Sequence, residues 1–140
     1  MDGPKKRFRT KTGRIESVSD RMTIITNQIR SNLRKIWSMY AVERDMVLFQ
    51  ARVEEPRKTK AGELAKVPKI LYVCATCKER FPMKDVQVDH IDEVGKTPDT
   101  YAGWGAWIAR LFTPASNLQV LCIPCHKKKT LQFRRNRANV

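Results

Sequence analysis

Two Cys-x-x-Cys pairs constrain this chain more than any other feature of its sequence. Cys74 and Cys77 form the first pair, and Cys122 and Cys125 form the second. Two residues between cysteines allow one tight turn to direct both sulfurs at one ion, and two such turns supply the four thiolates of a tetrahedral zinc site. A closed four-cysteine shell has no open coordination position. The sequence therefore predicts a structural Zn²⁺ site rather than a catalytic one.

The alternative use of these cysteines is as disulfides in an oxidising compartment. The N-terminal segment is basic but lacks the apolar stretch of a secretory signal. The longest apolar runs are far shorter than the roughly 18 residues that cross a bilayer. We therefore expect a protein of the reducing cytoplasm, with no membrane span and with cysteines that bind metal.

The charge of the chain indicates a polyanionic partner. Lys and Arg number 28 against 14 Asp and Glu, which gives a formal net charge of +14 in 140 residues. Because 41% of the residues are hydrophobic, the chain can also fill a modest core. We expect about one compact domain whose natural partner is polyanionic.

The chain divides into four segments by composition. Residues 1–19 are rich in basic residues and lack hydrophobic periodicity, which predicts a flexible arm. Residues 20–55 carry helical periodicity, and residues 56–69 hold two prolines and no periodicity, as in a linker. Residues 70–137 contain both cysteine pairs and form the predicted zinc domain.

Hydrophobic spacing predicts an α+β protein. Apolar residues three or four positions apart favour helices, and alternating apolar and polar residues favour strands. We expect helices at 20–40, 42–53, 100–112 and 124–135, and strands at 70–73, 86–90 and 118–121.

The two histidines of the chain lie at informative places. His90 follows Asp89 at the end of a predicted strand, and His126 directly follows Cys125. Taken alone, each histidine is more often a hydrogen-bonded structural imidazole. Since the cysteine pairs bring the two histidine segments into one small unit, however, both rings can converge with Asp89 and with Asn117.

These four residues match the needs of phosphodiester hydrolysis, which are a base to activate water and a divalent cation to neutralise charge. His90 would be the base, while Asp89 and His126 would hold Mg²⁺, Mn²⁺ or another divalent cation. Asn117 would either orient the His90 loop or act as a third ligand, and both roles stay open. The acids that follow are expected to form a solvated loop rather than further ligands: Asp92, Glu93 and Asp99.

Two segments carry a resemblance to a known family. They are the run Val88-Asp89-His90-Ile91 and residues 117–130, which read NLQVLCIPCHKKKT. Both resemble the zinc-containing HNH endonucleases, particularly the small ones of bacteriophages, and the likeness extends more loosely over residues 28–133. The resemblance implies a ββα-metal fold, with Asp89, His90 and Asn117 on a hairpin and His126 on the following helix. It also implies that His90, Asn117 and His126 form the motif and that Asp89 helps to bind the metal.

Together these features predict a metal-dependent HNH endonuclease that nicks or cuts DNA. Phage relatives add the terminase of genome packaging as an expected partner. Basic residues in and around the last helix are the expected DNA contacts: Lys127, Lys128, Lys129, Arg134 and Arg135. The alternative is a non-catalytic zinc-ribbon module that only binds nucleic acid. That module explains the charge and the cysteines but leaves the positions of Asp89, Asn117 and the histidines without a reason.

Overall fold

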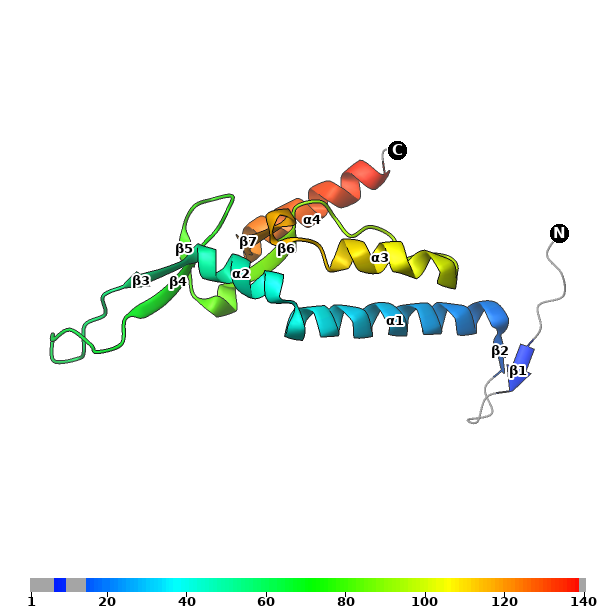
Figure 1. The fold of residues 1–140 in the computed structure, drawn as a ribbon, viewed down its shortest axis with the longest axis horizontal. Helices are drawn as coiled ribbons and strands as arrows, with labels where there is room; N and C mark the ends of the chain where they lie inside the picture. Colours follow the sequence, from blue (N-terminus) through cyan, green and yellow to red (C-terminus); the bar gives the residue numbers. More distant parts are fainter. Residues whose placement is uncertain (1–6, 10–14, 139–140) are drawn as a thin grey trace. The chain divides into compact units, whose positions relative to one another are not determined.

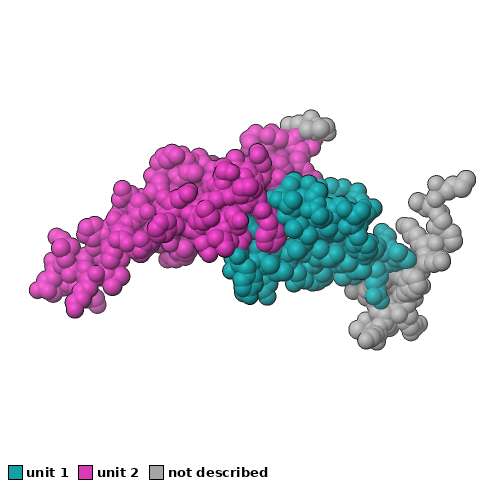
Figure 2. All heavy atoms as spheres, in the orientation of Figure 1, with its two compact units in different colours: residues 1–40, 95–111 teal, residues 41–94, 112–140 magenta. Residues whose placement is uncertain are grey.

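A computed structural model describes residues 7–9 and 15–138 of the protein. The described residues group into two compact units, one within residues 1–40 and 95–111 and the other within residues 41–94 and 112–140 (Figure 2). The described residues form four α-helices and small antiparallel sheets, which confirms the α+β class. Within those residues, every helix is too short or too polar to span a membrane.

The first unit is built on the long helix α1 (Val18–Tyr40). Ser17 and Asp20 form a capping box at its start. The Ser17 Oγ accepts a hydrogen bond from the Asp20 N–H at 3.0 Å, and the Asp20 Oδ2 accepts one from the Ser17 N–H at 3.1 Å. This cap starts the helix two residues earlier than the periodicity predicts.

Two short strands precede α1, in the segment that was expected to lack regular structure. They are β1 (Arg7–Arg9) and β2 (Ile15–Ser17), which pair in antiparallel register. The rest of the predicted basic arm, residues 1–6 and 10–14, lies outside the described residues.

Helix α3 (Trp104–Leu111) completes the first unit and follows one 3-10 turn (Tyr101–Gly103). Trp107 is fully buried, with its ring centroid 5.2 Å from that of Trp104 and its Nε1 donating to the Gly95 carbonyl at 3.4 Å. The Arg34 guanidinium of α1 lies 5.8 Å from the Trp107 ring centroid. These aromatic residues pack with α1 in the first unit, which includes residues 95–111, and the rest of residues 70–137 lie in the second unit.

In the second unit, a three-stranded sheet has the order β3-β4-β5. Its strands are β3 (Arg52–Glu55), β4 (Lys69–Val73) and β5 (Arg80–Phe81). Helix α2 (Val42–Ala51) ends two residues before the predicted position because Arg52 and Val53 pair with Tyr72 and Leu71 of β4. Residues 56–69, predicted as a linker, connect the β3–β4 hairpin (Figure 1). The pairing of β3 with β4 joins two segments that are distant in the chain, and a local sequence pattern does not reveal it.

A second antiparallel hairpin positions the candidate site. Strands β6 (Val86–His90) and β7 (Leu118–Cys122) pair along their whole length and are followed by helix α4 (Ile123–Ala138) (Figure 1). Helices α2 and α4 both contact this hairpin. Its buried apolar residues fill the centre of the unit: Val86, Leu118, Val120 and Leu121. Pro124 lies in the first turn of α4, where a missing N–H removes no helical hydrogen bond.

Replacement of the buried indole at Trp107 tests the packing of the first unit. We expect Trp107→Ala to lower the free energy of unfolding by about 3–5 kcal/mol, because it opens a large cavity beside Trp104. Chemical denaturation would measure the change. Phe49→Ala is the control, since Phe49 is 74% exposed and its loss should cost less than about 0.5 kcal/mol. Equal losses for the two variants would contradict the packing described here.

Candidate functional site

The four cysteines come together in the second unit. Cys74 follows β4, Cys122 ends β7, and Cys125 lies in the first turn of α4. The four Sγ atoms lie within 4.8 Å of one another, and those of Cys77 and Cys122 are 3.9 Å apart. Four sulfurs at about 2.3 Å from one zinc ion would be about 3.8 Å apart. The predicted quartet is thus confirmed as a cluster that could hold a metal ion such as zinc.

Backbone hydrogen bonds hold the first cysteine turn against β7. The Ala75 N–H donates to the Val120 carbonyl at 2.8 Å, and the Cys74 N–H donates to the Glu79 carbonyl at 2.9 Å. Lys78 adopts φ +64°, in the left-handed region that side chains other than glycine rarely enter. This turn therefore brings Cys77 towards the end of β7, although the two cysteine pairs are distant in the sequence.

The thiols of the cluster strongly influence one another. Burial raises the pKa of the Cys74 thiol, but hydrogen bonds from the backbone of Cys122, Cys77 and Thr76 and from the Cys77 side chain outweigh it and lower that pKa to about 6. The hydrogen bond with the Cys122 side chain raises the pKa of Cys125 to about 12, and burial adds to this effect. A cation bound by these four sulfurs would displace the protons of the thiols.

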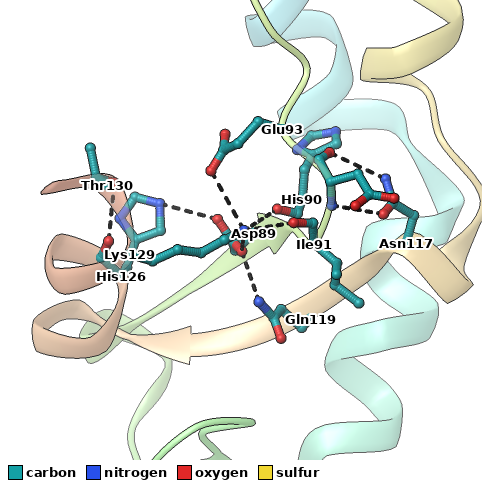
Figure 3. A network of polar contacts seen from close by, with 10 residues as sticks. Asp89, His90, Ile91, Glu93, Asn117, Gln119, His126, Lys129 and Thr130 are labelled. Carbon is teal, nitrogen blue, oxygen red and sulfur yellow. Dashed lines mark hydrogen bonds and ion pairs between the residues drawn. The ribbon is translucent and has the colours of Figure 1, made fainter. Parts of the chain in front are cut away.

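Asp89 lies at the centre of a second polar cluster in the same unit (Figure 3). Its side chain is 5% exposed, and its Oδ1 lies 3.6 Å from the Nε2 of His126 on α4. Its Oδ2 accepts hydrogen bonds from the Gln119 Nε2 at 3.0 Å and from the Lys129 Nζ at 2.6 Å. Gln119 reaches Asp89 because the β6–β7 register places the two residues opposite each other.

Asn117 supports the loop that follows His90. Its Oδ1 accepts a hydrogen bond from the Asp92 N–H at 2.9 Å, and its Nδ2 donates to the Thr113 Oγ1 at 3.1 Å. The Ile91 N–H donates to the Asn117 carbonyl at 2.7 Å. Asn117 was expected either to orient the His90 loop or to act as a third metal ligand. In this arrangement its side-chain amide orients the loop.

The ring of His90 lies on a different side of Asp89 from the ring of His126. Residue 90 is only 6% exposed. Figure 3 shows its ring on the Asn117 side of Asp89, while the His126 ring lies on the opposite side. Neighbouring residues of a strand point to opposite faces, so the Asp89 carboxylate and the His90 ring diverge. The structure brings Asp89 and His126 together, but not the His90 ring with them.

Lys129 differs from the other predicted DNA contacts. Its Nζ donates to Asp89 Oδ2, to the His90 carbonyl and, at 3.1 Å, to the Ile91 carbonyl, and it lies 3.5 Å from Glu93 Oε1. Glu93, expected in a solvated loop, therefore faces this cation. The remaining predicted contacts are exposed along α4: Lys127, Lys128, Arg134 and Arg135.

Sequence reasoning missed Gln119 as a member of this cluster and placed Lys129 on DNA. One signal for Lys129 was available. A residue three positions after His126 lies on the same face of a helix, so Lys129 had to point towards the hairpin if His126 did. For Gln119, by contrast, the signal is the register of the hairpin, which local sequence does not contain.

Loss of one sulfur tests the cysteine cluster. We expect Cys122→Ser to release bound zinc and to melt or aggregate, because zinc binding contributes about 10 kcal/mol or more of folding free energy in small structural sites. Metal analysis and thermal melting measure both effects. Thr76→Ala is the control, since this exposed side chain lies in the same turn and offers no metal ligand. A Cys122→Ser protein with full zinc content and unchanged melting would contradict a structural role.

No family model, curated protein or solved structure matches this chain. What the second unit can do therefore follows from its own residues and contacts. Those contacts join a cysteine cluster, an acid–histidine pair and an exposed basic helix on one hairpin–helix unit.

Proposed function

We propose that the protein is a divalent-metal-dependent DNA endonuclease of the HNH type. The observation that carries the proposal is the pair of Asp89 Oδ1 and His126 Nε2, which lie 3.6 Å apart between β6 and α4. Strands β6 and β7 and helix α4 have the strand–strand–helix order of the ββα-metal fold that the sequence resemblance implies. The cysteine cluster lies at the start of its helix, as expected for a zinc-containing member.

The spacing of this pair fits a shared cation. A separation of 3.6 Å is too long for a hydrogen bond. Two ligand atoms at about 2.1 Å from one divalent cation, at angles of about 90–120°, lie about 3.0–3.6 Å apart. Carboxylate oxygen and imidazole nitrogen are both suitable donors for Mg²⁺, Mn²⁺ or a similar ion. In the described part of the chain, the cysteine quartet is the only larger group of potential ligands, so this site would leave positions open for water and phosphate.

Each residue of the proposed site has a separate task. When bound, the divalent cation would neutralise charge on the phosphate and on the leaving oxygen. Asp89 and His126 would hold it, and Asn117 fixes the backbone after His90. His90 accepts the proton of the attacking water. Because its ring faces away from Asp89 here, this last role rests on the sequence motif.

The exposed basic face of α4 supports DNA as the substrate. Lys127, Lys128, Arg134 and Arg135 are exposed on the helix that carries His126. Phosphate contacts from such residues would place the backbone of DNA near the Asp89–His126 pair without reading its sequence. The formal net charge of +14 acts in the same direction. Action beside a phage terminase stays an expectation from the resemblance.

A non-catalytic nucleic-acid-binding module is the second candidate. It is favoured by the burial of His90 and by the lysine that already neutralises Asp89. Both candidates bind DNA, so only cleavage separates them. The decisive measurement is therefore made on the phosphodiester bond.

We expect the purified protein to nick or linearise supercoiled plasmid with Mg²⁺ or Mn²⁺ and not with a chelator that leaves the structural zinc in place. Asp89→Asn and His126→Ala should each slow cleavage at least about 100-fold, since each removes one ligand of the cation. Asp99→Asn is the matched control, because the Asp99 side chain is 88% exposed. Wild-type protein that binds plasmid but leaves it intact with every metal tested would favour the binding module.

Replacement of His90 tests the proposed base. We expect His90→Gln to slow single-turnover cleavage about 10²- to 10⁴-fold with unchanged zinc content and DNA affinity, because a general base contributes a factor of this size. Gel-based cleavage at saturating DNA measures the rate. Thermal melting shows whether the buried position tolerates glutamine. A folded His90→Gln variant that cuts at the wild-type rate would remove His90 from the mechanism.

A further inference from the structure

The second polar cluster contains a cation of its own. The Lys129 ammonium lies among four oxygen atoms, from the Asp89 and Glu93 carboxylates and from the carbonyls of His90 and Ile91. Its side chain is 26% exposed, so most of it is withdrawn from solvent. A lysine that serves a DNA phosphate would instead extend outward, as the exposed Lys128 beside it does.

Lys129 makes the two carboxylate oxygens of Asp89 unequal. Oδ2 is occupied by Lys129 at 2.6 Å and by Gln119 at 3.0 Å, while Oδ1 faces His126 at 3.6 Å. A carboxylate with one oxygen held in this way presents only the other to a metal ion. The same ammonium also fixes the carbonyl of His90, at the end of β6.

We propose that Lys129 is a positioning residue that shares the Asp89 carboxylate with the catalytic cation, holding Oδ2 so that Oδ1 alone binds the metal. This inference rests on the proposed function. Lys129 acts through Asp89 and the end of β6 rather than through the DNA backbone. Its positive charge also weakens metal binding, because two cations share one buried carboxylate.

Removal of this charge should have opposite effects on binding and on rate. In Lys129→Met, the metal loses a nearby like charge, and the Gln119 Nε2 alone stays hydrogen bonded to the Asp89 Oδ2. We expect Mn²⁺ to bind at least about tenfold more tightly. Single-turnover cleavage should fall about 100-fold, because the Asp89 and His90 backbone lose their fixed position. The loss of a lysine with a purely structural role would not tighten metal binding.

The experiment uses zinc-loaded full-length protein. Mn²⁺ affinity is measured without DNA from the paramagnetic resonance signal of free Mn²⁺, and DNA affinity is measured as a function of salt. Lys129→Met should leave the slope of log affinity against log salt unchanged. Lys128→Met is the matched control: its Mn²⁺ affinity should stay at the wild-type value, and its slope should shrink by about 0.9 because one phosphate contact is lost. Lys129→Arg keeps the charge and should keep the wild-type Mn²⁺ affinity.

Several results would overturn the assignment. Unchanged or weaker Mn²⁺ binding by Lys129→Met would do so, as would a salt slope reduced like that of Lys128→Met. If Lys129→Met loses zinc, Lys129→Gln replaces it and must show the same tightening. If the wild-type protein binds Mn²⁺ and cuts DNA, and Lys129→Met does both to the same extent, this inference is refuted but the proposed function is not. Wild-type protein that neither binds Mn²⁺ nor cuts DNA refutes the proposed function with it.

Discussion

The cysteine cluster is the constraint on which the second unit depends. It joins the turn after β4 to the junction of β7 and α4, and the 3.9 Å between the Sγ atoms of Cys77 and Cys122 matches the separation of two sulfurs around one tetrahedral ion. Leu121 and the partly buried Phe81 pack against it, so a small apolar cluster surrounds the cysteines. Because Cys122 ends β7 and Cys125 lies in the first turn of α4, the position of this cluster also sets where His126, the residue after Cys125, meets the hairpin.

The polar cluster around Asp89 is held together by charge pairing and hydrogen bonds. Asp89 is almost fully buried, and a buried carboxylate is costly unless it is paired and hydrogen bonded. Lys129 and Gln119 meet this need at one oxygen and leave the other towards His126. The same contacts tie α4 to the end of β6, so stability and the geometry of the proposed metal site depend on one carboxylate.

The proposed site is only partly assembled in this structure. Asp89 and His126 are close, and Asn117 holds the loop, but the His90 ring lies on the far side of the strand. Catalytic hydrogen bonds of enzymes without substrate are often poorly aligned.

The sequence by itself determined the features that depend on short spacing: the cysteine quartet, the charge, and the β6, β7 and α4 segments to within a few residues. Ligand spacing and periodicity are local, so they are visible without a fold. Only the tertiary structure decided that residues 52 and 53 leave the predicted helix to pair with β4, that residues 95–111 pack with α1, and that Lys129 turns inward to Asp89. Each of these depends on the register and packing of segments distant in the chain, where burial and charge pairing outweigh the local pattern.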